Sequence, residues 1–158
     1  MKTTLIIFIC LLISVLIYLF ILGIKSKTGN APGLINAQLT PCPRTPNCVN
    51  SEFPENSNHY IAPISISAEN KLNKPPLPLL INIVEGMGGK IINESHTYLA
   101  TTFTSPVFRF VDDLEIRIDT KKNLIHFRSA SRVGRSDLGT NLKRVKLLKE
   151  KYQSRTAS

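Results

Sequence analysis

The hydrophobic pattern begins with one long uncharged stretch near the N-terminus. Leu5 to Ile24 is a run of twenty residues without a charged side chain, LIIFICLLISVLIYLFILGI. A helix rises about 1.5 Å per residue, so this run matches the roughly 30 Å hydrocarbon core of a bilayer. Backbone groups cannot stay unpaired in lipid, which favours a single helix. The pattern predicts a transmembrane segment over residues 1–24, with a buried core helix as the alternative.

Two later stretches have the spacing of amphipathic helices. In the first, apolar side chains share one helical face at Leu77, Leu80, Ile81 and Val84. Gly88-Gly89 is a good terminator, so a helix is predicted over about 77–87. In the second, apolar side chains recur among Lys and Arg at Leu138, Leu142, Val145 and Tyr152. This spacing predicts a helix over about 137–152 that starts near Ser136-Asp137.

Between these helices the chain shows the pattern of strands. Strands are predicted over about 90–95, 98–104 and 124–129, with a shorter one over 60–66 that ends near Ser67, a residue suited to capping a turn. Apolar residues at 114, 116 and 118 alternate with charged ones at 115, 117 and 119, the pattern of a half-buried strand. The short loop 119–123 predicts a hairpin. The element order predicts an α+β fold, with about two helices on one face of an antiparallel sheet.

The composition along the chain suggests how it is divided. Residues 25–40 contain Gly, Pro, Asn, Ser and Thr without periodicity and are predicted to be a linker. The domain is predicted over 41–153, followed by a disordered tail over 154–158. No internal repeat is evident.

The flanks of the apolar run bear on cleavage and orientation. The run is longer than the roughly 7–15 residues of a signal-peptide core, and no small-x-small site follows closely, which favours an uncleaved signal anchor over a cleaved signal peptide. Lys2 and the α-amino group precede the run, whereas Lys25 and Lys27 follow it. The positive-inside rule is therefore nearly a tie.

The cysteine pair helps to choose the side of the membrane. Cys42 and Cys48 lie in the proline-rich segment C-P-R-T-P-N-C. A disulfide across this short loop is plausible and would require an oxidising compartment. Free thiols and half of a zinc site are the alternatives, although the only histidines, at 59, 96 and 126, are irregularly spaced. The disulfide predicts a single-pass membrane protein whose domain is extracytoplasmic, on the periplasmic side.

Charge is unevenly distributed and limits the classes of partner. The net charge is +9, and residues 121–158 hold eleven Lys and Arg but only two acidic residues. Such an excess suits anionic lipid, nucleic acid or acidic partners. A membrane segment on the same chain makes an anionic lipid or an envelope component the expected partner, and no nucleic acid is expected. A solvated helix face is the plainer alternative.

Three ordered motifs suggest a relationship to known proteins. They are C-P-R-T-P-N-C-V at 42–49, T-S-P-V-F-R-F-V-D-D at 104–113 and R-S-A-S-R-V-G-R-S-D-L-G-T-N at 128–141. Together they resemble the family known as domain of unknown function 1499, over about residues 41–150. The resemblance implies no activity; it implies bacterial and plastid-type proteins that often have a membrane or export segment. Arg135 stands where we expect an aromatic or small residue, which sets it apart from any common site.

The last two motifs also define a candidate site. A hairpin that turns at 119–123 brings position 113 near 129, so Asp112 and Asp113 can reach Arg128 or Arg132 as directional ion pairs. The plainest interpretation is that these pairs hold the loop 129–137 on the sheet. The residues expected to meet there are Arg109, Asp112, Asp113, Arg128, Ser129, Ser131, Arg132, Ser136, Asp137 and Asn141.

The same loop could bind an anion such as a phosphate, a carboxylate or a lipid headgroup. A helix start near 136–139 offers free N–H groups, and Arg128, Arg132 and Arg135 add positive charge. Asp137 opposes this function because its carboxylate can cap those N–H groups.

A hydrolase-like enzyme that uses the same cluster is the alternative class. Its candidates are Ser129 or Ser131 with His126 and Asp137, but His126 is expected to face solvent from a strand. The sequence has no G-x-S-x-G, no H-E-x-x-H and no phosphate-binding glycine loop. We therefore expect a membrane-anchored envelope protein with a non-catalytic binding or interaction domain, without cofactor or metal. A purely structural envelope protein, with every arginine occupied by acidic residues, is the further alternative.

Overall fold

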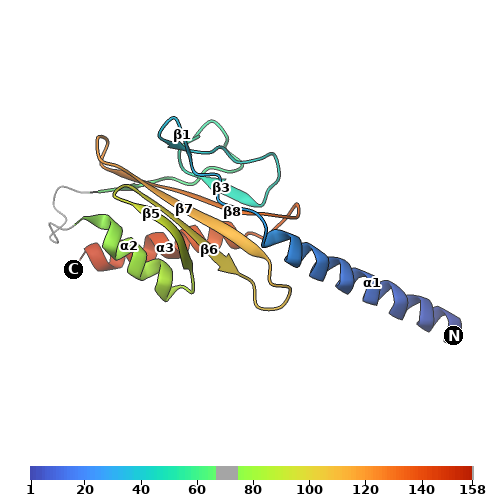
Figure 1. The fold of residues 1–158 in the computed structure, drawn as a ribbon. Helices are drawn as coiled ribbons and strands as arrows, with labels where there is room; N and C mark the ends of the chain where they lie inside the picture. Colours follow the sequence, from blue (N-terminus) through green and yellow to red (C-terminus); the bar gives the residue numbers. More distant parts are fainter. Residues whose placement is uncertain (67–74, 158) are drawn as a thin grey trace.

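The computed structural model describes residues 1–66 and 75–157. A long helix projects from one end of an α+β domain (Figure 1). The elements are α1 (Lys2–Ser26), β1 (Leu34–Ile35), β2 (Gln38–Leu39), β3 (Cys48–Asn50), β4 (Ile64–Ser65), α2 (Pro76–Gly86), β5 (Lys90–Ser95), β6 (Tyr98–Thr104), β7 (Val111–Asp119), β8 (Leu124–Ser131) and α3 (Thr140–Thr156). In α1, an apolar window with a mean hydropathy of 3.3 is long enough to cross a membrane.

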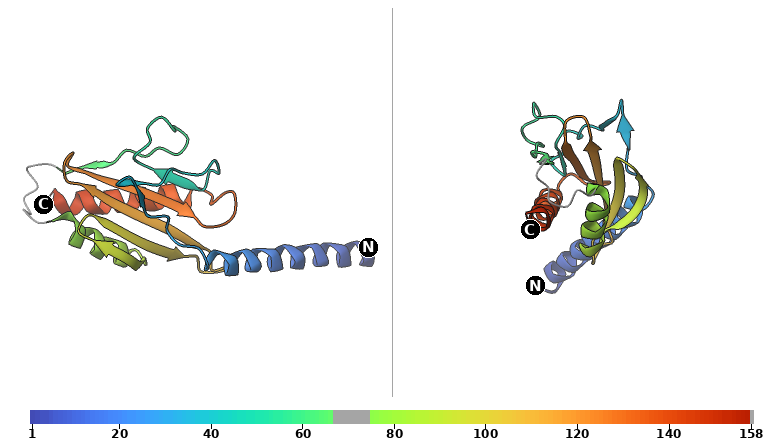
Figure 2. Two further views of the ribbon diagram at one scale, coloured as in Figure 1. Left: turned by 45° about the horizontal axis from the view of Figure 1, so that its top comes forward. Right: turned by 90° about the vertical axis from the view of Figure 1, so that its left-hand side faces the viewer.

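The main sheet is antiparallel, and its four longest strands lie close to the positions predicted along the chain. Its strand order is β3-β8-β7-β6-β5, and β4 also pairs with β8. The bounds of β5 and β6 match the prediction, and β7 and β8 form the predicted hairpin. Helices α2 and α3 lie on one face of this sheet, as Figure 2 shows from the end of the molecule. The α+β prediction is confirmed.

The hydrophobic core lies between the sheet and these two helices. On β7, Leu114, Ile116 and Ile118 point toward it. Leu80, Ile83 and Val84 of α2 meet Val145, Leu148 and Tyr152 of α3 there. The alternation of apolar residues that predicted β7 therefore marks the side of the sheet that the helices cover.

The prediction that β7 is half-buried is wrong. The side chain of Glu115, which points away from the helices, is also fully buried. The segment before β4 covers this second face: Leu39 is fully buried, and Glu52 pairs with Arg117 of β7. The region predicted to be a linker, 25–40, thus contains the β1–β2 hairpin and part of this covering layer. The sheet has a cover on both faces.

Smaller differences concern the ends of elements. Helix α3 begins at Thr140 rather than near 137, and Leu138, predicted on its apolar face, is 87% exposed with a φ of 54°. The same helix continues to Thr156, into the predicted tail. The strand predicted over 60–66 is limited to β4, and the predicted turn cap at Ser67 lies outside the described residues.

Candidate functional site

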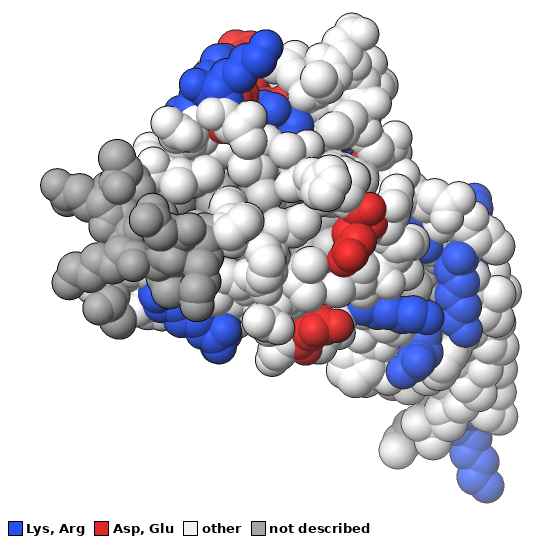
Figure 3. Space-filling view, turned by 60° about the vertical axis from the view of Figure 1, so that its left-hand side comes forward, with Lys and Arg blue, Asp and Glu red and all other residues white. Residues whose placement is uncertain are grey.

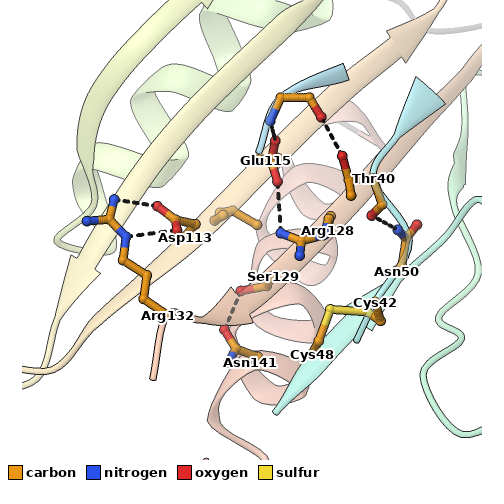
Figure 4. A network of polar contacts seen from close by, with 12 residues as sticks. Thr40, Cys42, Cys48, Asn50, Asp113, Glu115, Arg128, Ser129, Arg132 and Asn141 are labelled. Carbon is orange, nitrogen blue, oxygen red and sulfur yellow. Dashed lines mark hydrogen bonds and ion pairs between the residues drawn. A yellow bond between two sulfur atoms is a disulfide. The ribbon is translucent and has the colours of Figure 1, made fainter. Parts of the chain in front are cut away.

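The polar motif 128–141 begins on β8, where its arginines meet acidic residues of β7. Arg132 donates two hydrogen bonds to Asp113, from Nε to Oδ2 at 2.8 Å and from Nη2 to Oδ1 at 2.7 Å (Figure 4). Both side chains are almost fully buried. The predicted pairing of an arginine in this loop with Asp113 is confirmed. The register differs by one residue, because Asp113 lies opposite Ala130 rather than position 129.

Arg128 does not pair with either aspartate; its partner is Glu115, which the sequence reasoning missed. Glu115 accepts hydrogen bonds from Arg128 Nη1 at 3.0 Å, from the Tyr98 hydroxyl at 2.7 Å and from the Gly33 N–H at 2.9 Å. Burial raises the pKa of the Glu115 carboxyl, and burial together with the Glu115 contact raises the pKa of Tyr98. Glu115 therefore joins three parts of the chain beneath the N-terminal layer.

A second network lies on the helix side of the sheet, where Asp112 pairs with Arg144 of α3 at 2.8 Å. Arg144 also contacts the Asn141 side-chain oxygen and lies 4.6 Å from the centroid of the Phe103 ring. Ser129 donates to the same Asn141 oxygen at 2.6 Å, and Asn141 donates to the Ser131 hydroxyl at 3.1 Å. These bonds fix the start of α3 to the end of β8.

The remaining predicted site residues are Arg109, Ser136 and Asp137, and Asp137 borders the second network through Asn141. Arg109 is exposed on the β6–β7 loop with a φ of 61°, and no ion pair is found for it within the described part of the chain. The Ser136 hydroxyl accepts the Leu138 N–H at 3.3 Å. Asp137 accepts the N–H groups of Gly139 at 3.1 Å and Asn141 at 2.7 Å, so it occupies the helix start as a cap. The polar motif therefore serves first to hold the loop and α3 on the sheet.

The disulfide prediction is confirmed. Cys42 and Cys48 are bonded, with 5.7 Å between their Cα atoms. Cys48 begins β3, which pairs with β8 at Ala130. The bridge therefore fixes the proline-rich segment against the strand from which the polar motif emerges.

His126 was predicted to face solvent, but the covering layer buries it. Its Nδ1 lies 3.2 Å from the Ser51 hydroxyl oxygen, which accepts the Phe127 N–H at 2.7 Å. His126 and Ser129 stand three positions apart on β8, so their side chains leave opposite faces of the sheet. The structure does not bring the proposed nucleophiles Ser129 and Ser131 to this histidine.

The burial of His126 makes stability depend on pH. Burial lowers the pKa of His126, so the unfolded chain binds a proton more readily than the folded one. The stabilisation is present above the unfolded pKa of about 6.5 and is lost as pH falls below it. We expect the free energy of unfolding to fall between pH 7.5 and 5.5, and less so in His126→Gln. Urea unfolding at both pH values measures this; equal losses in the two proteins would contradict it.

The excess of basic residues in the C-terminal part lies largely on α3. Lys143, Lys146 and Arg155 are exposed there, and Lys and Arg predominate over Asp and Glu on the face drawn in Figure 3. A shallow groove between α2 and α3 has Lys143 and Lys151 on its wall, together with Phe103. Arg144, in the same groove, is already paired with Asp112.

A more enclosed pocket lies where α1 meets the domain. Its volume is about 260 Å³. One wall is apolar and includes Leu19 and Leu22 of α1. The other walls come from the start of β7, the loop after β8 and the start of α3, and they include four of the predicted site residues: Asp112, Ser131, Ser136 and Asp137. The pocket thus combines an apolar wall from the long helix with hydroxyl and carboxylate groups of the polar motif.

Comparison with known proteins identifies the family. The family model described as "Protein of unknown function (DUF1499)" matches residues 38–151. This match covers most of the chain, so the chain belongs to that family, as the three motifs predicted. Neither the search of curated proteins nor the search of solved structures finds a match.

Proposed function

We propose that this member of the DUF1499 family is a single-pass membrane protein whose non-catalytic domain lies on the oxidising, extracytoplasmic side and binds a membrane lipid beside its anchor. The length and hydropathy of α1 support the anchor. The Cys42–Cys48 disulfide supports an oxidising compartment. The separation of His126 from Ser129 and Ser131 favours binding over hydrolysis.

The docking of α1 on the domain supports an anchor that is retained. Leu19, Leu22, Gly23 and Ser26 are spaced at i, i+3, i+4 and i+7, so they share the helix face that turns toward the domain. Ser26 is fully buried; its hydroxyl accepts the Val111 N–H at 3.0 Å and its carbonyl accepts Arg132 Nη1 at 3.3 Å. Cleavage after Ser26 would remove these contacts from the domain.

The pocket between α1 and the domain is the observation on which the binding function rests. Leu19 and Leu22 belong to the apolar run, so this pocket opens at the depth where lipid chains meet headgroups. At about 260 Å³ it is smaller than the roughly 300–1,000 Å³ of sites that enclose a whole small molecule, which suits part of a lipid.

The charges in the pocket favour one kind of lipid headgroup. Two charged side chains line the pocket: Asp112, which is paired with Arg144, and Asp137, which accepts the backbone N–H groups of Gly139 and Asn141. The Asp137 carboxylate disfavours an anion within the pocket and suits a hydroxyl or ammonium group. We therefore propose a lipid whose acyl chain contacts Leu19 and Leu22 and whose polar part presents such a group.

Native mass spectrometry of the full chain, extracted in mild detergent from membranes that contain phosphatidylethanolamine and phosphatidylglycerol, tests this function. We expect one retained lipid, with phosphatidylethanolamine preferred. Val133→Trp should fill the pocket and remove that lipid, because Val133 lines it. Leu138→Trp is the matched control, since Leu138 lies in the same loop but is 87% exposed. A wild-type chain without lipid, or equal lipid in both variants, would contradict the proposal.

A further inference from the structure

We propose that the β6–β7 loop, residues 105–110, is a second membrane contact, which inserts Val107 into the boundary between lipid headgroups and acyl chains and places Arg109 among the phosphates. This inference rests on the proposed anchoring by α1. It concerns a different surface from the lipid pocket and a different occupant, the bilayer itself.

The position of the loop along α1 gives its depth. The Phe108 ring lies 5.3 Å from the Phe20 ring in an edge-to-face arrangement. Phe20 precedes Ile24, the end of the apolar run, by four residues, which is about 6 Å at 1.5 Å per residue. Apolar groups of interfacial segments reach roughly 5–10 Å into this boundary. Phe108 therefore lies at the depth of a membrane-inserted side chain.

A close backbone contact keeps the loop at this depth. A Cβ atom added at Gly23 would lie 1.8 Å from the Phe108 carbonyl oxygen, so only glycine allows the helix and the loop to approach this closely. The loop is also closed on itself. Ser105 N–H donates to the Phe110 carbonyl at 2.8 Å, and the Ser105 hydroxyl accepts the Phe110 N–H at 2.9 Å. Contacts within the protein therefore hold the loop in this conformation without any contact with lipid.

The side chains at its tip match the two layers of a membrane interface. Val107 is 65% exposed and projects from a loop that flanks the apolar helix. Its neighbour Arg109 is exposed, and a long basic side chain can reach outward to phosphate while its stem stays in an apolar layer. Lys25 and Lys27, which follow the apolar run, are also exposed. Cations beside apolar side chains favour a bilayer with anionic lipid over water.

Electron paramagnetic resonance of spin-labelled full chains tests this contact in nanodiscs of phosphatidylethanolamine and phosphatidylglycerol. The variants carry Cys10→Ala, which removes the only free cysteine among the described residues, and one new label site. Val107→Cys is the test. Ile21→Cys, 56% exposed on α1, reports anchoring. Lys122→Cys, in the exposed β7–β8 turn at the other end of the domain in Figure 1, reports water.

The inference predicts that the label at 107 is more accessible to oxygen than to a water-soluble nickel complex, as at 21 and opposite to 122. If the label at 107 is more accessible to the nickel complex, as at 122, while the label at 21 is more accessible to oxygen, the inference is overturned and the proposed anchoring by α1 still stands. Low access to both reagents at 107 would mean cover by protein, and would also overturn it. If the labels at all three sites are more accessible to the nickel complex than to oxygen, the proposed anchoring by α1 is itself wrong.

Discussion

Replacing Glu115 with alanine should lower the free energy of unfolding by about 3–5 kcal/mol, the cost of leaving one member of a buried ion pair alone. Glu115 is fully buried and accepts three hydrogen bonds, from Arg128, Tyr98 and Gly33. Its loss would leave the Arg128 guanidinium without an anion in a site where Arg128 Nε is already buried and has no hydrogen-bond partner among the residues that the structure describes. Burial raises the cost of such unpaired groups.

Chemical unfolding of the full chain in mild detergent measures this loss. Glu94→Ala is the matched control, because Glu94 is an exposed residue of β5 and its loss should change stability by no more than about 0.5 kcal/mol. If Glu115→Ala does not fold, Glu115→Gln keeps the shape and removes the charge, and it should still be less stable than the wild type. Equal stability of Glu115→Ala and Glu94→Ala would contradict the role given to this residue.

Arg132→Ala should have an effect of similar size, about 3–5 kcal/mol, and should also loosen the contact of α1 with the domain. Its guanidinium donates to both oxygens of Asp113 and to the Ser26 carbonyl at the end of α1. The variant therefore leaves Asp113 as an unpaired buried carboxylate. It also removes one of the bonds that join α1 to the sheet.

Arg135→Ala is the control, since Arg135 is exposed in the same loop and should tolerate the change. A double-mutant cycle with Asp113→Ala separates the pair from the rest of the site, and we expect a coupling of roughly 1–3 kcal/mol. Proteolysis after Lys25 or Lys27 should be faster in Arg132→Ala than in Arg135→Ala. If the losses in unfolding free energy of Arg132→Ala and Asp113→Ala are additive, and Arg132→Ala is cut no faster than Arg135→Ala, then Arg132 holds neither Asp113 nor α1.

The fold could be predicted well where the information is local. Strands β5 and β6 and helix α2 follow from periodicity, prolines and glycines over a few neighbouring residues. The β7–β8 hairpin follows from the short loop between two strands. The start of α3 was misplaced because Leu138 continues the apolar spacing, although its backbone has a φ of 54° and its side chain is exposed.

The burial of the second sheet face could not be predicted from β7 and β8 themselves. Their polar alternation is typical of a face in water, but here the N-terminal segment covers it. The Gly33 N–H reaches Glu115 across 82 positions, a separation for which local spacing provides no signal. The same cover buries His126. In the sequence, a buried strand face with Glu and Arg has the same pattern as a solvated face, because the segment that covers it is distant along the chain.

The candidate site was predicted in part. The motif spacing brought Asp113 to Arg132, but the hairpin register is shifted by one residue, and in a strand one residue decides which face a side chain takes. Asp112 shares the face of Leu114 on β7, so it turns toward α3 and pairs with Arg144, which is not among the predicted residues. The pocket beside α1 has a weak signal in the sequence: two small residues, Gly23 near the end of the bulky apolar run and Ser26 just after it.

The most direct test of the proposed anchored, extracytoplasmic domain is the accessibility of Cys42 and Cys48 in intact cells that produce the Cys10→Ala variant. A membrane-impermeant thiol reagent is applied before and after mild reduction, and the chain size is measured in the membrane fraction. The account predicts no labelling before reduction, labelling after it, and a membrane-bound chain of full length. Labelling that needs no reductant but appears only after the cells are broken would place the domain in the cytoplasm and contradict the account.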